Sequence, residues 1–153
     1  MKCIKASLLA VSLLLVVPAY AHEGHDSPGA LPAPPNGGKV AEASHSAAHE
    51  GGAEERELFA EAKLQGSLLR IYALGLDAKN TKVWMPLPPS AALTLTDVKV
   101  EMPRAKKTNA VSVHATAGGW EGDIGAIKDR RIVVVATFLD GKEKKQAKIQ
   151  LEK

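Results

Sequence analysis

This 153-residue chain contains little cysteine and has a small net charge, and each of these features excludes a class of protein. The single cysteine, Cys3, cannot form an intrachain disulfide or a cysteine-based zinc site. The formal net charge of +3 is small, so we expect no nucleic-acid partner. The 13 glycines and 9 prolines favour short strands and turns over long helices.

Catalytic motifs are absent as well. The sequence contains no Gly-x-Ser-x-Gly elbow, no phosphate-binding loop and no His-Glu-x-x-His pair. Asp123 and Asp129 flank a turn, but spacing identifies no partner for either carboxylate. We therefore predict that the protein is not an enzyme, and we assign no catalytic residue.

Residues 1–21 have the three-part layout of a secretory signal peptide. Lys2 and Lys5 form a basic start, residues 6–17 form an apolar run, and Ala19-Tyr20-Ala21 supplies small residues for cleavage. The apolar run is too short to cross about 30 Å of hydrocarbon. We predict cleavage after Ala21, a periplasmic location, and a mature chain that begins at His22 with no cysteine and no membrane span.

Residues 22–56 are predicted to form a flexible, acidic arm that carries histidines. Residues 22–36 show no apolar period and contain four prolines, which is typical of a disordered or polyproline-like segment. Residues 39–55 are rich in alanine and are interrupted by Gly51-Gly52, so they would form one or two marginal helical turns at most. Carboxylates outnumber basic groups in the arm, whereas Lys and Arg are in excess from residue 58 onward.

From residue 57 onward, the apolar residues follow a period of two, which is the period of β-strands. A phase slip near Asp97 predicts a β-bulge, and Asp140-Gly141 predicts a hairpin turn. Residues 132–139 are apolar on both faces, so we expect a central, covered strand. The predicted strands cover residues 57–64, 68–76, 82–85, 93–102, 111–116, 120–124, 132–139 and a last segment around 147–152. We predict an all-β fold, an immunoglobulin-like antiparallel β-sandwich over residues 57–153 with a flexible N-terminal arm.

Four of the five histidines lie in the arm, and they are the candidate metal ligands: His22, His25, His45 and His49. Residues 22–26 contain both His22 and His25 together with two carboxylates, and imidazole suits copper, nickel and zinc. A free α-amine at His22 would add a second nitrogen to its ring nitrogen. His45 and His49 would lie one turn apart if this piece were helical. The alternative for both pairs is an acidic arm or linker without a metal.

Other metal-capable and aromatic side chains receive structural interpretations. His114 is expected to face solvent from a strand. Met85 and Met102 each precede a proline at a strand end, where packing in the core or at its rim explains them better than thioether ligation of Cu(I). Trp84 and Trp120 are expected in the sandwich core.

Short motifs follow one another in a characteristic order along the chain. His-Glu-Gly-His-Asp at 22–26 precedes Pro-Asn-Gly-Gly-Lys-Val at 35–40, and Glu-Leu-Phe at 57–59 precedes Leu-Arg-Ile-Tyr at 69–72. This order resembles small periplasmic proteins of metal-efflux systems, and it is similar to the His-rich N-terminal domain of adaptor subunits in heavy-metal RND efflux pumps. The long hairpin and lipoyl-type segments of a full adaptor are absent. The resemblance implies a β-sandwich that binds copper, zinc, cobalt, nickel or cadmium, with the four arm histidines as the matching positions.

The sequence therefore leads to one functional hypothesis and one rival. The first is a periplasmic protein that buffers or delivers a transition-metal ion (copper, zinc, nickel or cobalt), with copper or zinc favoured. The ion would be cargo rather than a catalytic cofactor, and the partner would be a periplasmic adaptor or an efflux-pump subunit. The rival is an envelope protein–protein interaction module with no metal role.

Overall fold

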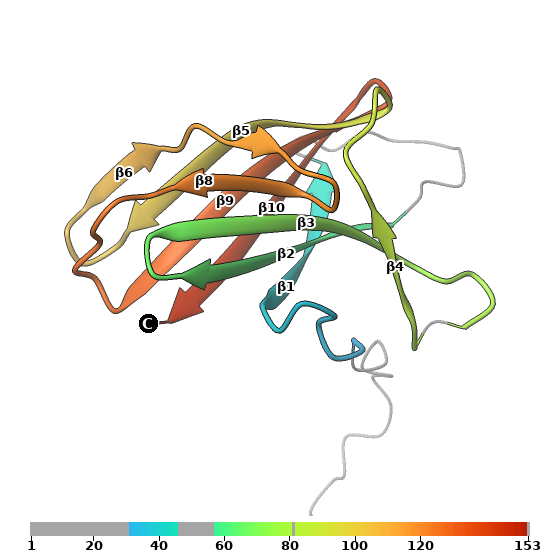
Figure 1. The fold of residues 1–153 in the computed structure, drawn as a ribbon, viewed down its shortest axis with the longest axis horizontal. Coiled ribbons are helices and arrows are strands. Elements are labelled where there is room, and N and C mark those ends of the chain that lie inside the picture. Colours follow the sequence, from blue (N-terminus) through green and yellow to red (C-terminus); the bar gives the residue numbers. More distant parts are fainter. Residues whose placement is uncertain (1–30, 46–56, 81, 153) are drawn as a thin grey trace, which may run out of the picture. The chain divides into compact units, whose positions relative to one another are not determined.

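The computed structural model of the chain describes residues 31–45, 57–80 and 82–152. Every regular element in this part of the chain is a β-strand, and all strand pairs are antiparallel. The strands are β1 (Lys39–His45), β2 (Leu58–Gln65), β3 (Leu68–Leu76), β4 (Trp84–Leu87), β5 (Leu93–Met102), β6 (Lys107–Ala110), β7 (His114–Ala115), β8 (Trp120–Asp123), β9 (Arg131–Asp140) and β10 (Glu143–Glu152). The prediction of an all-β antiparallel fold is confirmed (Figure 1).

The strands form two layers that one strand joins. Their order is β6-β5-β9-β10-β1-β2-β3-β8-β7, and β4 pairs with β3 off this path. The first part of β1, Lys39–Ala43, pairs with β2, whereas Ser44 and His45 pair with β10. In Figure 1, β2, β3 and β8 cross in front of β5, β9 and β10, so the sheet folds over on itself as a sandwich.

The hydrophobic core lies between these layers because the inward positions of both are apolar. Trp120 of β8 meets Phe138 of β9 edge to face, with ring centroids 5.7 Å apart. The middle of β9 is buried on both faces, which confirms the predicted central strand. Fully buried core side chains include Leu58, Leu69, Ile71, Val98, Val100, Val134, Phe138 and Ile149.

Two local predictions are confirmed at the level of single residues. The register of β5 against β9 shifts between Leu95 and Asp97, where the apolar phase slips in the sequence. β9 and β10 form a hairpin in which Asp140 pairs with Glu143, and Gly141 adopts a φ of 63° in the turn. The turn chemistry and the alternation therefore fix the registers of these two strand pairs.

The sandwich begins earlier than the sequence predicted. The arm was expected to run to residue 56, and its 39–55 stretch was expected to form marginal helical turns at most. Instead, Lys39–His45 forms β1, and residues from 31 onward belong to the same compact unit as the sandwich. Because β1 contains two small alanines and one buried position, Ala43, its own sequence carries a weak strand signal. β1 is therefore stabilised as a strand by its hydrogen-bonded pairing with β2 and with β10, and not by its own sequence preference.

The predicted strand over residues 111–116 is also corrected. The structure instead places β6 at Lys107–Ala110 and β7 at His114–Ala115, on opposite margins of the strand order. Val111 and Val113 still pack against the core, so their alternation reflects burial. The chain crosses from one layer to the other at this point. Val111 still donates its N–H to the Val98 carbonyl of β5, and β7 then pairs with β8 of the second layer.

The segment 31–38 covers the outer face of β2. Phe59, Glu61 and Lys63 of β2 face the side of this segment, because alternate side chains of a strand lie on the same face. Lys63 donates a hydrogen bond to the Asn36 carbonyl (2.8 Å). Phe59 packs edge to face on Trp84 with centroids 5.1 Å apart, and Trp84 donates from Nε1 to the Pro32 carbonyl (3.0 Å). A second small apolar cluster therefore forms outside the main core, and Trp84 belongs to it.

Glu61 is the central residue of this outer face, and its side chain is fully buried. Its carboxylate accepts hydrogen bonds from the Gly38 N–H (2.7 Å), the Asn36 N–H (3.1 Å) and Asn36 Nδ2 (2.9 Å). Gly37 adopts a φ of 72°, and a Cβ at Gly38 would lie 2.4 Å from the Ala62 carbonyl oxygen. The Pro-Asn-Gly-Gly motif is thus a turn that a buried carboxylate holds. We call it the Glu61 clamp.

Several predictions concern residues outside the described ones. The signal peptide, the cleavage point after Ala21 and the first part of the arm fall within residues 1–30, and the end of the arm falls within residues 46–56. Within the described ranges, no helix is long and apolar enough to cross a membrane.

Candidate functional site

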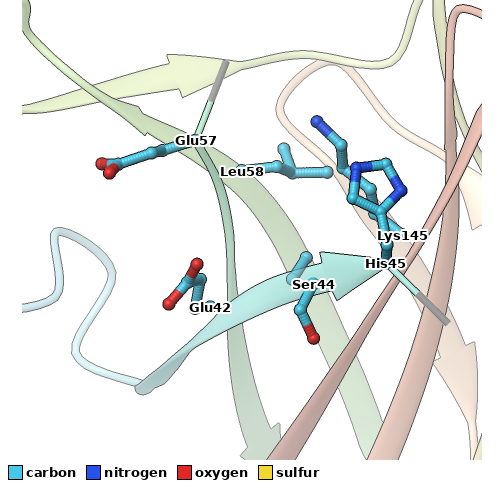
Figure 2. A pocket seen from close by; sticks show the side chains of 7 residues that line it. Glu42, Ser44, His45, Glu57, Leu58 and Lys145 are labelled. Atoms are coloured by element: carbon cyan, nitrogen blue, oxygen red, sulfur yellow. The ribbon is translucent and has the colours of Figure 1, made fainter. Parts of the chain in front are cut away.

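A small open pocket of about 150 Å³ lies at the end of β1 opposite the Glu61 clamp (Figure 2). β1 supplies one wall, the start of β2 supplies the second, and β10 supplies a single buried residue. The residues that line it are Glu42, Ala43, Ser44, His45, Glu57, Leu58 and Lys145. The pocket thus combines an imidazole, an ammonium group and carboxylates around an apolar floor.

Strand register brings His45 and Lys145 together. The two residues are direct partners in the β1–β10 pairing, so their side chains lie on the same face. Lys145 is also in phase with Ala147 and Ile149, which point into the core. Its side chain therefore enters the sandwich interior, and the residue is 3% exposed.

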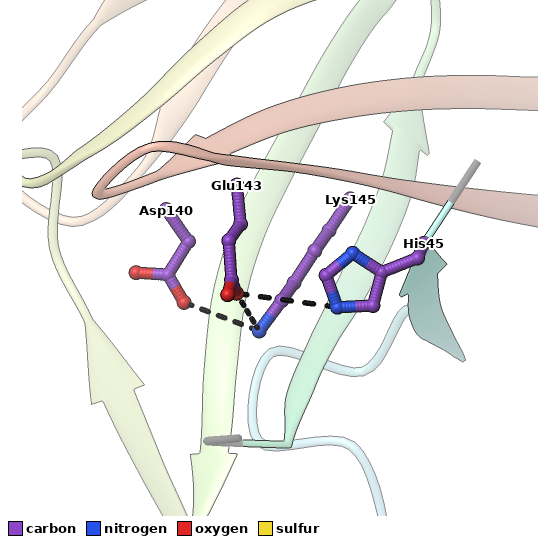
Figure 3. A network of polar contacts seen from close by, with 4 residues as sticks. All are labelled: His45, Asp140, Glu143 and Lys145. Atoms are coloured by element: carbon purple, nitrogen blue, oxygen red, sulfur yellow. Dashed lines mark ion pairs between the residues drawn. The ribbon is translucent and has the colours of Figure 1, made fainter. Parts of the chain in front are cut away.

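Carboxylates from the β9–β10 hairpin surround this buried ammonium group (Figure 3). Lys145 Nζ lies 3.6 Å from Asp140 Oδ2 and 3.6 Å from Glu143 Oε2. The same Glu143 oxygen lies 3.9 Å from His45 Nε2. A buried cation needs such partners because removal from water costs several kcal/mol. Glu143 is thus shared between a lysine and a histidine, and we call these four residues the Lys145 cluster.

The charge balance of the site favours a cation. Two pocket carboxylates, Glu42 and Glu57, add to those of Asp140 and Glu143, so negative groups outnumber the single lysine. Figure 2 shows the Glu42 and Glu57 carboxylates on the side of the pocket away from the His45 ring. Imidazole nitrogen and carboxylate oxygen are ligands that zinc, copper and nickel accept.

The structure places one of the four candidate metal ligands. His45 is the last residue of β1 and lies half-buried in the pocket beside Glu143. His22, His25 and His49 lie outside the described residues, so the four-histidine site stays a prediction. Among the residues that the structure describes, no group of three or more His, Cys, Asp or Glu side chains is arranged to hold a metal ion.

The structural interpretations of the other side chains are largely confirmed. His114 is exposed on β7, Met102 lies in the core, and Met85 is an exposed rim residue of β4. Trp120 belongs to the main core as predicted. Trp84 is buried in the second cluster instead, because it points to the outer face of β4.

Sequence reasoning missed the charged residues of both buried sites. Lys145 could have been found, because the alternation of Ala147, Ile149 and Leu151 extends back to it and places it inward. The sequence predicts Asp140 only as a turn residue, and no sequence pattern marks Glu143 as part of a site. The approach of Glu143 and Lys145 to His45 depends on the β1–β10 register, which joins residues about a hundred positions apart in the chain.

No family model, no curated protein and no solved structure matches the chain. The sequence motifs and the site geometry are therefore the basis for a functional proposal.

Proposed function

We propose that the protein is a periplasmic metal-binding protein that buffers a transition-metal ion or delivers it to an efflux system. The observation that carries the proposal is the position of His45, half-buried in an acidic pocket and 3.9 Å from a Glu143 carboxylate oxygen. His49 follows four residues later, and His22 and His25 follow the predicted signal peptide. The resemblance to the His-rich domain of heavy-metal efflux adaptors supports the same function.

The ligand chemistry favours zinc or copper. Imidazole and carboxylate groups bind both ions, and the chain after the predicted cleavage point contains no thiolate that would select soft metals. Few ligands, most of them in a segment with little apolar content, favour modest affinity and rapid exchange. A protein that passes its ion to an adaptor or pump subunit needs both properties.

The sandwich contributes a rigid support under this hypothesis. β1 joins the two layers, so the pocket at its end is held by both of them. The buried side of the pocket rests on the core through Ala43 and Leu58. His45 is thereby presented at a fixed position, while the remaining ligands would come from the arm.

Isothermal titration of the exported protein with Zn(II), Cu(II) and Ni(II) tests the proposal. We expect binding near micromolar or tighter, and loss of binding when His22, His25, His45 and His49 are all replaced by alanine. His114→Ala is the matched control, because His114 is exposed on β7. Binding should weaken as the pH falls through the range of about 6 to 7 in which imidazoles usually take up protons. Equal affinity at pH 5 and pH 7.5 would contradict histidine ligation.

The second candidate function is an envelope interaction module. Val83 and Met85, next to and within β4, are 46% and 42% exposed, which offers apolar surface to a partner. The four-histidine variant separates the two functions, because it should lose metal binding and retain docking. The interaction module is the better explanation if two results are found together. The four-histidine variant binds metal ions with wild-type affinity, and the Val83→Ser/Met85→Ser variant no longer binds an envelope protein that the wild type binds.

A further inference from the structure

Four charged or titratable side chains share one face of the β9–β10–β1 region. Glu143 and Lys145 are two residues apart on β10 and thus lie on the same face. Asp140 pairs with Glu143 across the hairpin, and His45 pairs with Lys145 across the β1–β10 junction. Register alone therefore brings all four together, and the ion-pair distances of 3.6 to 3.9 Å follow from it.

The Lys145 ammonium is the cation that Asp140 and Glu143 share in the structure. It lies 3.6 Å from one carboxylate oxygen of Asp140 and 3.6 Å from one of Glu143 (Figure 3). The Glu143 oxygen that it contacts is the one nearest to His45 Nε2. A metal ion on the His45 imidazole that takes this oxygen as a second ligand would therefore compete with the lysine for it.

We propose that Lys145 is an internal competitor of the metal ion at His45. The proposal rests on the proposed metal-binding function and adds a means of regulating that site. When a metal ion binds to His45 and Glu143, the Lys145 ammonium moves away from Glu143 and retains its contact with Asp140. When the ion leaves, the lysine returns and neutralises the carboxylate. The tethered cation thereby lowers the affinity and speeds the release that delivery to a partner requires.

The burial of Lys145 supports this role. A lysine at an inward position costs folding free energy that an apolar residue would not. Its neighbours in the same phase, Ala147 and Ile149, are apolar, so packing alone gives no reason for a charge at this position. Glu143 is 48% exposed in its side chain, so it can turn between a buried partner and an ion that arrives from solvent.

The first test compares zinc titrations of the exported wild-type protein with those of two methionine variants. Lys145→Met keeps an unbranched side chain that is one atom shorter than lysine, and it removes the charge. We expect on the order of tenfold tighter zinc binding, because a cation close to the metal position is lost. Lys148→Met, on the exposed face of the same strand, is the matched control and should bind as the wild type does. The gain should vanish in the His45→Ala/Lys145→Met double variant.

The outcomes separate the two proposals. If neither the wild type nor Lys145→Met binds Zn(II), Cu(II) or Ni(II), the proposed function and this inference are both overturned. If the wild type binds zinc and a folded Lys145→Met binds with the same or lower affinity, the metal-binding function stands and Lys145 is not a competitor.

A second measurement uses the wild-type chain and is independent of how the variant folds. An amine-reactive label, read by mass spectrometry, reports the exposure of each lysine. Zinc at saturation should raise the labelling rate of Lys145 several-fold and leave that of Lys148 unchanged. A Lys145 rate that stays the same or falls when zinc is bound overturns the inference.

Discussion

The two ends of β1 each adjoin a buried charge, and the two charges are held in different ways. At the Lys39 end, the Glu61 carboxylate accepts hydrogen bonds of 2.7 to 3.1 Å from backbone N–H groups and from the Asn36 amide. At the His45 end, the Lys145 ammonium is surrounded by carboxylate side chains at 3.6 Å. Both residues are almost fully buried, so burial alone does not distinguish a structural charge from one available for binding.

The difference lies in the partners. Backbone N–H groups in a turn cannot move without unfolding the turn, so the Glu61 clamp has a single arrangement. Carboxylate side chains such as Glu143, which is half-exposed, can rotate to another cation at small cost. The hydrogen bonds give the Glu61 clamp a structural role, and we propose a binding role for the Lys145 cluster. Four substitutions test whether the two buried charges differ in this way.

Glu61→Ala should have the largest effect on stability. The substitution leaves the part-buried Gly38 and Asn36 N–H groups without this acceptor, and it removes the main attachment of residues 36–38 to β2. We expect a loss of about 3 kcal/mol in the free energy of unfolding. Urea denaturation measures it. A loss below about 1 kcal/mol would mean that the clamp does not hold the turn as described.

Gly38→Ala tests the same turn through its backbone. The added Cβ would lie 2.4 Å from the Ala62 carbonyl oxygen, so β1 and β2 must move apart. We expect a loss of about 2 kcal/mol, as for other overpacked positions. Gly118→Ala is the control, because nothing lies within 4 Å of a Cβ there. Similar stability of the two variants in thermal melts would contradict the close approach of the strands.

Lys145→Met should cost far less stability than Glu61→Ala, although both remove a buried charge. Of the two carboxylates that remain, the half-exposed Glu143 can turn toward water, and methionine suits the apolar surroundings of β10. We expect a change within about 1 kcal/mol in either direction. If chemical denaturation instead shows a loss of unfolding free energy as large as that of Glu61→Ala, the Lys145 cluster has a structural role as well.

Glu143→Gln should have the smallest effect on folding and a measurable effect on metal binding. Asp140 still partners the lysine, so the free energy of unfolding should change by less than about 0.5 kcal/mol. Zinc affinity should fall because the ligand beside His45 loses its charge. Unchanged affinity in a zinc titration would remove Glu143 from the proposed ligand set.

Much of the fold follows from local patterns, and the exceptions have a common cause. Alternation predicts β2, β3 and β9, a phase slip predicts the bulge near Asp97, and Asp140-Gly141 predicts the last hairpin. β1 was not predicted, because its alanine-rich sequence has little strand preference and becomes a strand through its pairing with β2 and β10.

The candidate site was predictable to the extent that it depends on residue type. A histidine-bearing segment near carboxylates marks His45 as a candidate ligand in the sequence. The other members of the Lys145 cluster reach His45 through the register between β1 and β10. Register between strands distant in sequence leaves no trace in a single sequence, so the shared use of Glu143 by Lys145 and His45 required the structure.

The proposed metal site at the end of β1 is tested most directly by a zinc titration of the protein at pH 7.5, with His45→Ala and His114→Ala measured beside the wild type. We expect His45→Ala to weaken zinc binding on the order of tenfold or more, because an imidazole ligand is lost, and we expect His114→Ala to bind as the wild type does. Equal zinc affinity in all three proteins would contradict a metal site at the end of β1.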